Sequence, residues 1–277
     1  MQNAGLAALG LNWRYLAFDV PPDQLRAAID GARTLGLIGL NLTVPHKLLA
    51  LDLVDALDES ARLWGAVNTI RFEARDADGQ WLRLGALAQP PTGEIRAHGF
   101  NTDADALTRA LREDLEIEPA GATVLLLGAG GAGRTAALKL ATEGVAALHL
   151  VNRTRAKAEA VADEIRRRWP GVRLSFEYPA GPIDLVLNAT SLGLRPGDDL
   201  PFDANSFSPR QARAAYDMIY RPVATEFLRL VQAAGCHTAN GLGMLLYQGA
   251  KALELWTGQP APVEVLRQAL RQHVYGI

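Results

Sequence analysis

Three glycines with dinucleotide-binding spacing follow directly after an apolar run, residues 123–127. They are Gly128, Gly130 and Gly133. In such a turn the first glycine permits the tight strand-to-helix bend, the second lets backbone approach a pyrophosphate, and the third lets the helix pack closely on the strand. We expect that helix to begin near Ala132, with its N-terminal amides facing the phosphates. The predicted cofactor-binding residues of this loop are Gly128, Ala129, Gly130, Gly131, Ala132 and Gly133.

A second apolar run, residues 147–151, ends where the residue that reads the cofactor ribose is expected, about 20 residues after the last glycine. An NAD-binding site would favour an acid at this point. The chain instead carries Asn152, Arg153 and Thr154, with Lys157 close behind. Hydrogen-bond donors and positive charge suit the 2′-phosphate of NADP. The alternative is that these residues are solvated and simply open a surface helix.

Two polar clusters follow apolar segments in the first part of the chain. One ends in Thr43 and Lys47, and the other contains Asp103. Ligands of open α/β sheets bind at the carboxyl ends of strands, so both clusters are candidates for a site. Taken singly, each also has an ordinary interpretation, because most lysines lie at the surface and an acid in a first helical turn stabilises the helix dipole.

Composition excludes several other functions. The 277 residues carry a formal net charge of −2 and no basic stripe, which argues against a nucleic-acid partner. The single cysteine, Cys236, rules out an internal disulfide and suits a reducing compartment. No apolar run reaches membrane-spanning length, so we expect a cytoplasmic protein without a membrane partner. We predict no metal site.

The periodicity of apolar residues predicts an α/β protein of two domains. Expected helices cover residues 1–9, 22–35, 103–112, 155–168, 243–256 and 263–272, besides the one after the glycine turn. Expected strands cover residues 13–20, 37–43, 68–73, 81–87, 123–127, 147–151, 174–176, 183–187 and 214–218. The order strand, helix, strand over residues 13–43 predicts parallel neighbours in the first sheet. Residues 81–87 are expected to pair with a neighbour across the turn at residues 76–79.

Taken in order, the polar and glycine motifs resemble those of the shikimate dehydrogenase family. The matching segments are NLTVPHK (41–47), GAVNT (65–69), NTD (101–103), GAGGAG (128–133), NRT (152–154), NATSLG (188–193), YDMIY (216–220) and NGLGMLLYQ (240–248). The resemblance implies an open α/β substrate-binding domain, residues 1–102 completed by helices in 241–277. It also implies a Rossmann-like NADP-binding domain, residues 103–240, with the active site in the cleft between the two.

The resemblance further implies roles for single residues. Lys47 and Asp103 would be the catalytic pair, and Met218 and Gly241 would lie beside the nicotinamide. The substrate site would be lined by Thr43, Asn68, Asp103, Tyr220 and Gln248. The implied reaction is the reversible reduction of 3-dehydroshikimate to shikimate with NADPH. A quinate or shikimate dehydrogenase that uses NAD is an alternative, against which Arg153 argues.

The chemistry of Lys47 and Asp103 agrees with that assignment. Hydride transfer to a ketone carbon leaves charge on the oxygen, so a donor near that oxygen must supply a proton or a positive charge. Lys47 can do either. A carboxylate beside it would hold the ammonium in place and accept hydrogen bonds from substrate hydroxyls.

The family pattern also includes a β-strand and a Ser-x-Ser-Pro segment, placed before the helix that matches residues 1–9, whose hydroxyls bind the substrate carboxylate. This sequence contains no match to that segment. We therefore expect NADPH binding with weak or no saturable reduction of dehydroshikimate. Either Met1 is an internal methionine of a longer protein or the chain is a shortened paralogue that binds NADP without turnover. The sequence does not determine the oligomeric state, for which a homodimer is one candidate.

Overall fold

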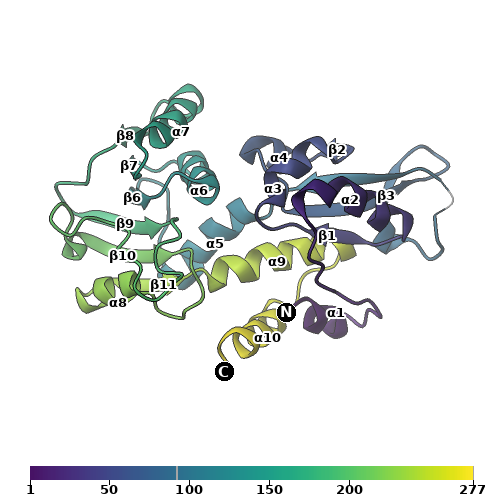
Figure 1. Cartoon of the computed structure of the whole chain (residues 1–277). Helices are drawn as coiled ribbons and strands as arrows, with labels where there is room; N and C mark the ends of the chain where they lie inside the picture. Colours follow the sequence, from purple (N-terminus) through teal and green to yellow (C-terminus); the bar gives the residue numbers. More distant parts are fainter. Residues whose placement is uncertain (92, 277) are drawn as a thin grey trace. The chain divides into compact units, whose positions relative to one another are not determined.

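A computed structural model shows that the protein consists of two compact units. The structure describes residues 1–91 and 93–276. Unit 1 comprises Met1–Asp103 and Leu246–Ile277, and unit 2 comprises Ala104–Leu245. In Figure 1 the strands of unit 1 are purple to blue and those of unit 2 are teal to green. Each unit has its own sheet, so the predicted α/β class with two domains is confirmed.

The sheet of unit 1 is mixed. Its strands, in spatial order, are β1 (Gly39–Asn41), β3 (Thr69–Arg75), β5 (Ile95–Phe100) and β2 (Ala56–Leu57), and β4 (Trp81–Arg83) pairs with β3 outside this path. Only β2 and β5 run parallel, whereas β3 is antiparallel to β1, β4 and β5. The predicted pairing of residues 81–87 across the turn is confirmed for residues 81–83, whereas Leu84–Ala86 form a 3-10 helix instead of strand. The prediction of parallel neighbours over residues 13–43 is wrong.

Residues 13–20 contain no strand, contrary to the prediction. Leu16 and Phe18 are 65% and 69% exposed. The segment is held instead by Tyr15, whose N–H donates to Asn3 and whose hydroxyl donates to Asn41. A strand requires a neighbour for its backbone groups, and no strand of the described residues pairs with this segment.

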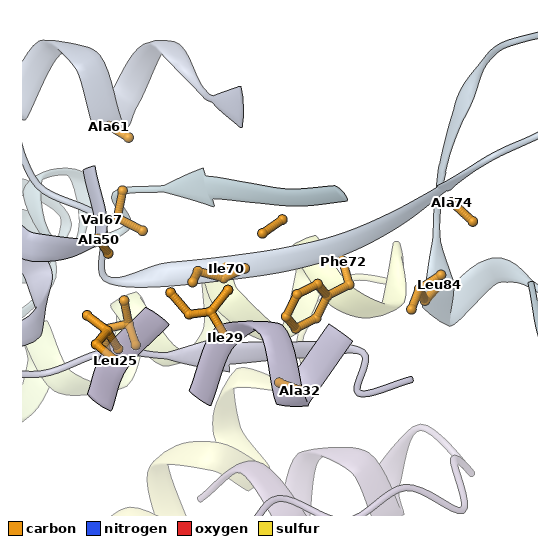
Figure 2. Close-up of a cluster of buried hydrophobic side chains, with 12 residues drawn as sticks. Leu25, Ile29, Ala32, Ala50, Ala61, Val67, Ile70, Phe72, Ala74 and Leu84 are labelled. Atoms are coloured by element: carbon orange, nitrogen blue, oxygen red, sulfur yellow. The ribbon is translucent and has the colours of Figure 1, made fainter. Parts of the chain in front are cut away.

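The core of unit 1 forms between helix α2 (Leu25–Thr34) and the central strand β3. Leu25, Ile29 and Ala32 share one face of the helix because they lie four and three residues apart. Figure 2 shows them facing Ile70 and Phe72 of β3. The other helices of this part are α1 (Gln2–Ala8), α3 (His46–Leu49), α4 (Glu59–Trp64), α9 (Leu242–Thr257), which begins in unit 2, and α10 (Val263–Tyr275).

Unit 2 contains a six-stranded sheet in which every neighbouring pair is parallel. In spatial order its strands are β8 (Arg173–Ser175), β7 (Ala147–Val151), β6 (Thr123–Leu127), β9 (Ile183–Asn188), β10 (Ala212–Asp217) and β11 (His237–Asn240). Numbered from β6, this is the order 3-2-1-4-5-6 of doubly wound dinucleotide-binding sheets. The helices are α5 (Asp103–Leu115), which begins at the last residue of unit 1, α6 (Gly131–Thr142), α7 (Arg155–Arg168) and α8 (Glu226–Ala233).

The strand order reverses between β6 and β9, which are hydrogen-bonded neighbours. Ligands of such sheets bind outside the carboxyl ends of the strands at this reversal. The glycine turn follows β6 directly, so the fold places it where a dinucleotide is expected. No helix of the described residues combines the length and the apolar character needed to cross a membrane.

Candidate active site

The glycine turn has the geometry that close approach of a phosphate requires. Gly128 has a φ of +104°, which side chains disfavour, and a Cβ at Gly133 would collide with the carbonyl oxygen of Gly128. Helix α6 starts at Gly131 with Gly130 as its N-cap. A Cβ at either of these two positions would meet no atom within 4 Å, so the space in front of the helix is open. These residues fit a pyrophosphate held by N-terminal amides.

Asn152 joins the glycine turn to the loop after β7. Its Oδ1 accepts from the N–H of Ala129 at 2.9 Å, and its Nδ2 donates to the carbonyl of Thr154 at 2.7 Å. The side chains of Arg153, Thr154 and Lys157 are exposed. Within residues 1–91 and 93–276, neither Arg153 nor Lys157 has an ion-pair partner. These two cations are therefore available to an anion such as a 2′-phosphate.

Lys47 and Asp103 form an ion pair in unit 1. The Lys47 Nζ donates to the Asp103 Oδ2 at 2.8 Å, although 56 positions separate the two residues. Their side chains are 29% and 14% exposed, so the pair is partly buried and still accessible to solvent. Lys47 lies on α3, the short helix after Pro45, and Asp103 begins α5. The side-chain oxygen of Asn101 accepts from the Asp103 N–H at 3.1 Å and fixes the start of that helix.

A buried hydrogen-bond cluster lies next to Asp103 in the chain. The Asn68 Nδ2 donates to the hydroxyl of Thr102 at 2.9 Å, and the Asn68 Oδ1 accepts from the Thr102 N–H at 2.8 Å. Thr102 also donates to the carbonyl of Gln248 on α9, at 3.0 Å. The cluster continues from Thr69 to Asn41, whose Nδ2 donates to the Thr69 hydroxyl at 3.0 Å. A satisfied buried network of this kind fixes the side chains that border it.

The structure groups the predicted substrate residues by unit. Asn68, Asp103 and Gln248 belong to this part of unit 1, and Thr43, which is exposed, lies just before the helix that carries Lys47. Tyr220 lies in unit 2 and is 38% exposed. The sequence interpretation gave Thr102 no role in the site and considered it only as an N-cap of the following helix, although it stands between Asn101 and Asp103 in a recognised motif.

The two predicted nicotinamide residues adjoin each other in unit 2. Met218 follows β10, and Gly241 lies between β11 and α9. A Cβ at Gly241 would collide with the carbonyl oxygen of Met218. A glycine is thus required at this position for the two backbones to approach each other.

The parallel sheet with its open glycine turn defines a dinucleotide-binding α/β protein. Three family descriptions match the chain: "Shikimate dehydrogenase substrate binding domain" over residues 1–70, "Shikimate / quinate 5-dehydrogenase" over 111–190 and "Shikimate 5'-dehydrogenase C-terminal domain" over 241–271. A protein of Methanopyrus kandleri named shikimate dehydrogenase (NADP(+)) is 41% identical over 282 residues, covering 99% of this chain and 90% of that protein. The chain belongs to the shikimate dehydrogenase family, as its motifs predicted.

Solved structures agree with the family and with the fold. The shikimate 5-dehydrogenase of Thermus thermophilus, in complex with NADP(H) and shikimate, matches with a TM-score of 0.78 at 34% identity over 98% of this chain and 92% of that one. The ligand-free 5-ketofructose reductase of a Gluconobacter species matches with a TM-score of 0.79 at 34% identity over 98% and 91% of the two chains. The fold alone therefore does not define the substrate.

Proposed function

We propose that this protein catalyses the reversible reduction of 3-dehydroshikimate to shikimate with NADPH. The observation that carries the proposal is the ion pair of Lys47 and Asp103 beside the Asn68 and Thr102 cluster. It supplies a cation and a carboxylate that a hydroxylated ketone can engage together. The names of the curated relatives, shikimate dehydrogenase (NADP(+)), support the same reaction.

In this proposal unit 2 binds the cofactor and unit 1 binds the substrate. The open glycine turn would hold the pyrophosphate, and Arg153, Thr154 and Lys157 would hold the 2′-phosphate. Met218 and Gly241 would adjoin the nicotinamide. When bound, NADPH supplies the hydride. Thr43, Asn68, Asp103 and Gln248 of unit 1 would orient the substrate. Tyr220 remains a predicted substrate residue.

Lys47 has the central chemical role. Its ammonium would donate a hydrogen bond, and then a proton, to the ketone oxygen as negative charge develops there. Asp103 accepts from Lys47 at 2.8 Å, which restricts where the ammonium can lie. The second oxygen of that carboxylate would accept from a substrate hydroxyl. In the reverse direction the same lysine would receive the proton of the hydroxyl that is oxidised.

A second candidate is reduction of a sugar ketone. It is favoured by the likeness to 5-ketofructose reductase, whose identity to this chain equals that of the Thermus shikimate dehydrogenase, 34%. Both substrates are polyhydroxylated ketones, but only dehydroshikimate carries a carboxylate. A quinate preference is a third, narrower alternative within the family description.

The test is steady-state kinetics of the 277-residue protein with NADPH or NADH and with 3-dehydroshikimate, 3-dehydroquinate or 5-ketofructose, alongside fluorescence titration of both cofactors. We expect the highest kcat/KM with NADPH and 3-dehydroshikimate. A higher value for another ketone would replace the proposed substrate. NADPH binding without turnover of any ketone would favour a cofactor-binding paralogue.

We further infer a cytoplasmic location, which cell fractionation tests. The homodimer remains a hypothesis, which light scattering tests by measuring the molar mass in solution.

A further inference from the structure

Three neighbouring strands of unit 2 end in a row of polar residues. Asp217, the last residue of β10, is in register with Asn188 of β9 on one side and with Asn240 of β11 on the other. The row lies at the carboxyl ends of the strands, and the glycine turn follows the carboxyl end of β6 in the same sheet. Asp217 is fully buried, and neither the glycine turn nor the Lys47 pair uses it.

All the polar contacts described for the Asp217 carboxylate are hydrogen bonds that it accepts. Its Oδ1 accepts from the Asn188 Nδ2 and from the N–H of Ile219, both at 3.0 Å. Its Oδ2 accepts from the hydroxyl of Thr225 at 2.6 Å. Thr225 is also the N-cap of α8, where its Oγ1 accepts from the N–H of Leu228. A single buried side chain thus joins the end of β10, the loop after it and the start of the next helix.

The loop between β10 and α8 is fixed at further points by the same row. The N–H of Met218 donates to the carbonyl of Asn188 at 3.0 Å, and the N–H of Gly241 donates to the carbonyl of Ile219 at 3.2 Å. The Asn240 Nδ2 donates to the carbonyl of Val223 at 2.7 Å. These bonds fix the backbone of the loop, in which Tyr220 is 38% exposed.

The buried position of Asp217 makes these donors necessary. Burial raises the pKa of this carboxyl to about 6, although the hydrogen bonds from Thr225, Ile219 and Asn188 oppose the shift. Within the described part of the chain no cation pairs with this carboxylate, so its burial costs free energy that the three hydrogen bonds must offset. The segment that it fixes begins at Met218, which the proposed function places beside the nicotinamide.

We propose that Asp217 is a positioning residue that fixes the backbone of residues 218–220 for binding of the nicotinamide end of the cofactor. The inference rests on the proposed function for the identity of the cofactor. Asp217 acts through the Ile219 amide and the Thr225 hydroxyl, because it is buried beneath the loop and its oxygens are occupied by those donors.

The experiment compares two ligands that differ in the nicotinamide. NADPH contains it, whereas adenosine 2′,5′-bisphosphate keeps the adenosine with its 2′- and 5′-phosphates and lacks the second phosphate, the second ribose and the nicotinamide. In Asp217→Ala we expect the Kd of NADPH to rise at least about tenfold, the effect of one or two lost hydrogen bonds. The Kd of the bisphosphate should stay within about twofold. Asp217→Asn should bind NADPH nearly as the parent does, because an amide can accept from Asn188 and Ile219 and donate to a reoriented Thr225 hydroxyl.

Asp203→Ala is the matched control, because Asp203 accepts from Asn205 and Ser206 on an exposed loop of the same unit. It should change neither Kd. If Asp217→Ala does not fold, Thr225→Val keeps Asp217 and its Oδ1 contacts but removes the Oδ2 contact together with the N-cap bond to Leu228; it should give the same selective loss, smaller in size. An unchanged NADPH Kd in the folded variant would overturn the inference, as would equal losses for both ligands with a lower Tm. Because these measurements require no turnover, they remain decisive if the proposed reaction fails.

Discussion

Replacing Lys47 by alanine tests the proposed chemistry most directly. The change removes the ammonium 2.8 Å from Asp103 and leaves the carboxylate in place. We expect kcat to fall strongly, because the ammonium is needed most when charge develops on the ketone oxygen. KM for dehydroshikimate should change less, since Asn68, Asp103 and Gln248 would still orient the substrate.

The magnitude follows from the type of step and from the exposure of the pair. A positioned general acid contributes about 10² to 10⁴ in rate, which is about 2.7 to 5.4 kcal/mol of barrier. The Lys47 side chain is 29% exposed, so water can reach the vacated position and replace part of its function. We therefore expect the lower part of this range, a loss in kcat of about 10² to 10³.

A second variant separates the proton from the charge. Lys47→Arg keeps a cation that can still pair with Asp103, but a guanidinium does not release its proton at neutral pH. If proton donation matters, Lys47→Arg should remain close to Lys47→Ala in kcat. If only charge matters, it should recover most of the rate.

Stopped-flow absorbance of NADPH measures the rates, and fluorescence titration verifies that the cofactor still binds. The matched control is Lys251→Ala, which removes a 58% exposed lysine that pairs with Glu254 on α9. It should leave kcat unchanged. The reasoning is refuted if Lys47→Ala, with NADPH bound, retains kcat within about threefold of the parent, since general acid catalysis would then be worth far less than its usual factor.

Three further changes test the remaining groups. Asp103→Asn should lower kcat and raise KM for dehydroshikimate, with a loss of about tenfold or more in kcat/KM, because a charged hydrogen bond is replaced by a neutral one. Steady-state kinetics close to those of the parent would contradict this role. Arg153→Ala should weaken NADPH binding by about 1.5 to 3 kcal/mol and leave NADH nearly unchanged in fluorescence titration, and equal losses would remove the 2′-phosphate assignment. Burial alone would raise the pKa of Glu73, but hydrogen bonds from His98, Arg71 and Arg96 lower it to about 2. The pKa of Glu73 is therefore lower in the folded state than in the unfolded state, so the ionised carboxylate stabilises the fold above about pH 5 and this contribution is lost as the pH falls toward 2. Glu73→Gln should reduce the dependence of the unfolding free energy on pH in this range, measured by urea unfolding. An unchanged dependence would exclude Glu73 as its source.

The fold of unit 2 was largely predictable because its signals are local. Strands of a parallel sheet are covered on both faces and appear as continuous apolar runs. The runs at residues 123–127, 147–151 and 183–187 are such segments, and β6, β7 and β9 begin at the predicted residues. The strand that the prediction missed, β11 (His237–Asn240), lies at the sheet edge and is partly exposed, so it carries little apolar signal.

Unit 1 was less predictable because its sheet depends on partners distant in sequence. Strand β5 (Ile95–Phe100) was not predicted, although it lies between β3 and β2. Its sequence contains Arg96 and His98, polar residues that a periodicity argument assigns to solvent. Both face Glu73 of β3, at 2.7 and 3.1 Å, and that contact makes their partial burial tolerable. The wrong prediction for residues 13–20 has the opposite cause. Their residue types suit a strand, but no strand of the described residues lies beside them to pair with their backbone.

The same distinction explains which parts of the site could be found from sequence. The glycine turn is contiguous, so its spacing alone predicts its geometry. Lys47 and Asp103 lie on two helices, 56 positions apart, that only the fold brings together. The family motifs rather than their spacing pointed to the pair. Thr102 and Asp217 bear no ligand-binding signature, because their side chains serve neighbouring backbone and side-chain groups. Residues that orient a site through buried hydrogen bonds can therefore be assigned only once those bonds are known, and Asp217 is the case where that assignment leads to a new experiment.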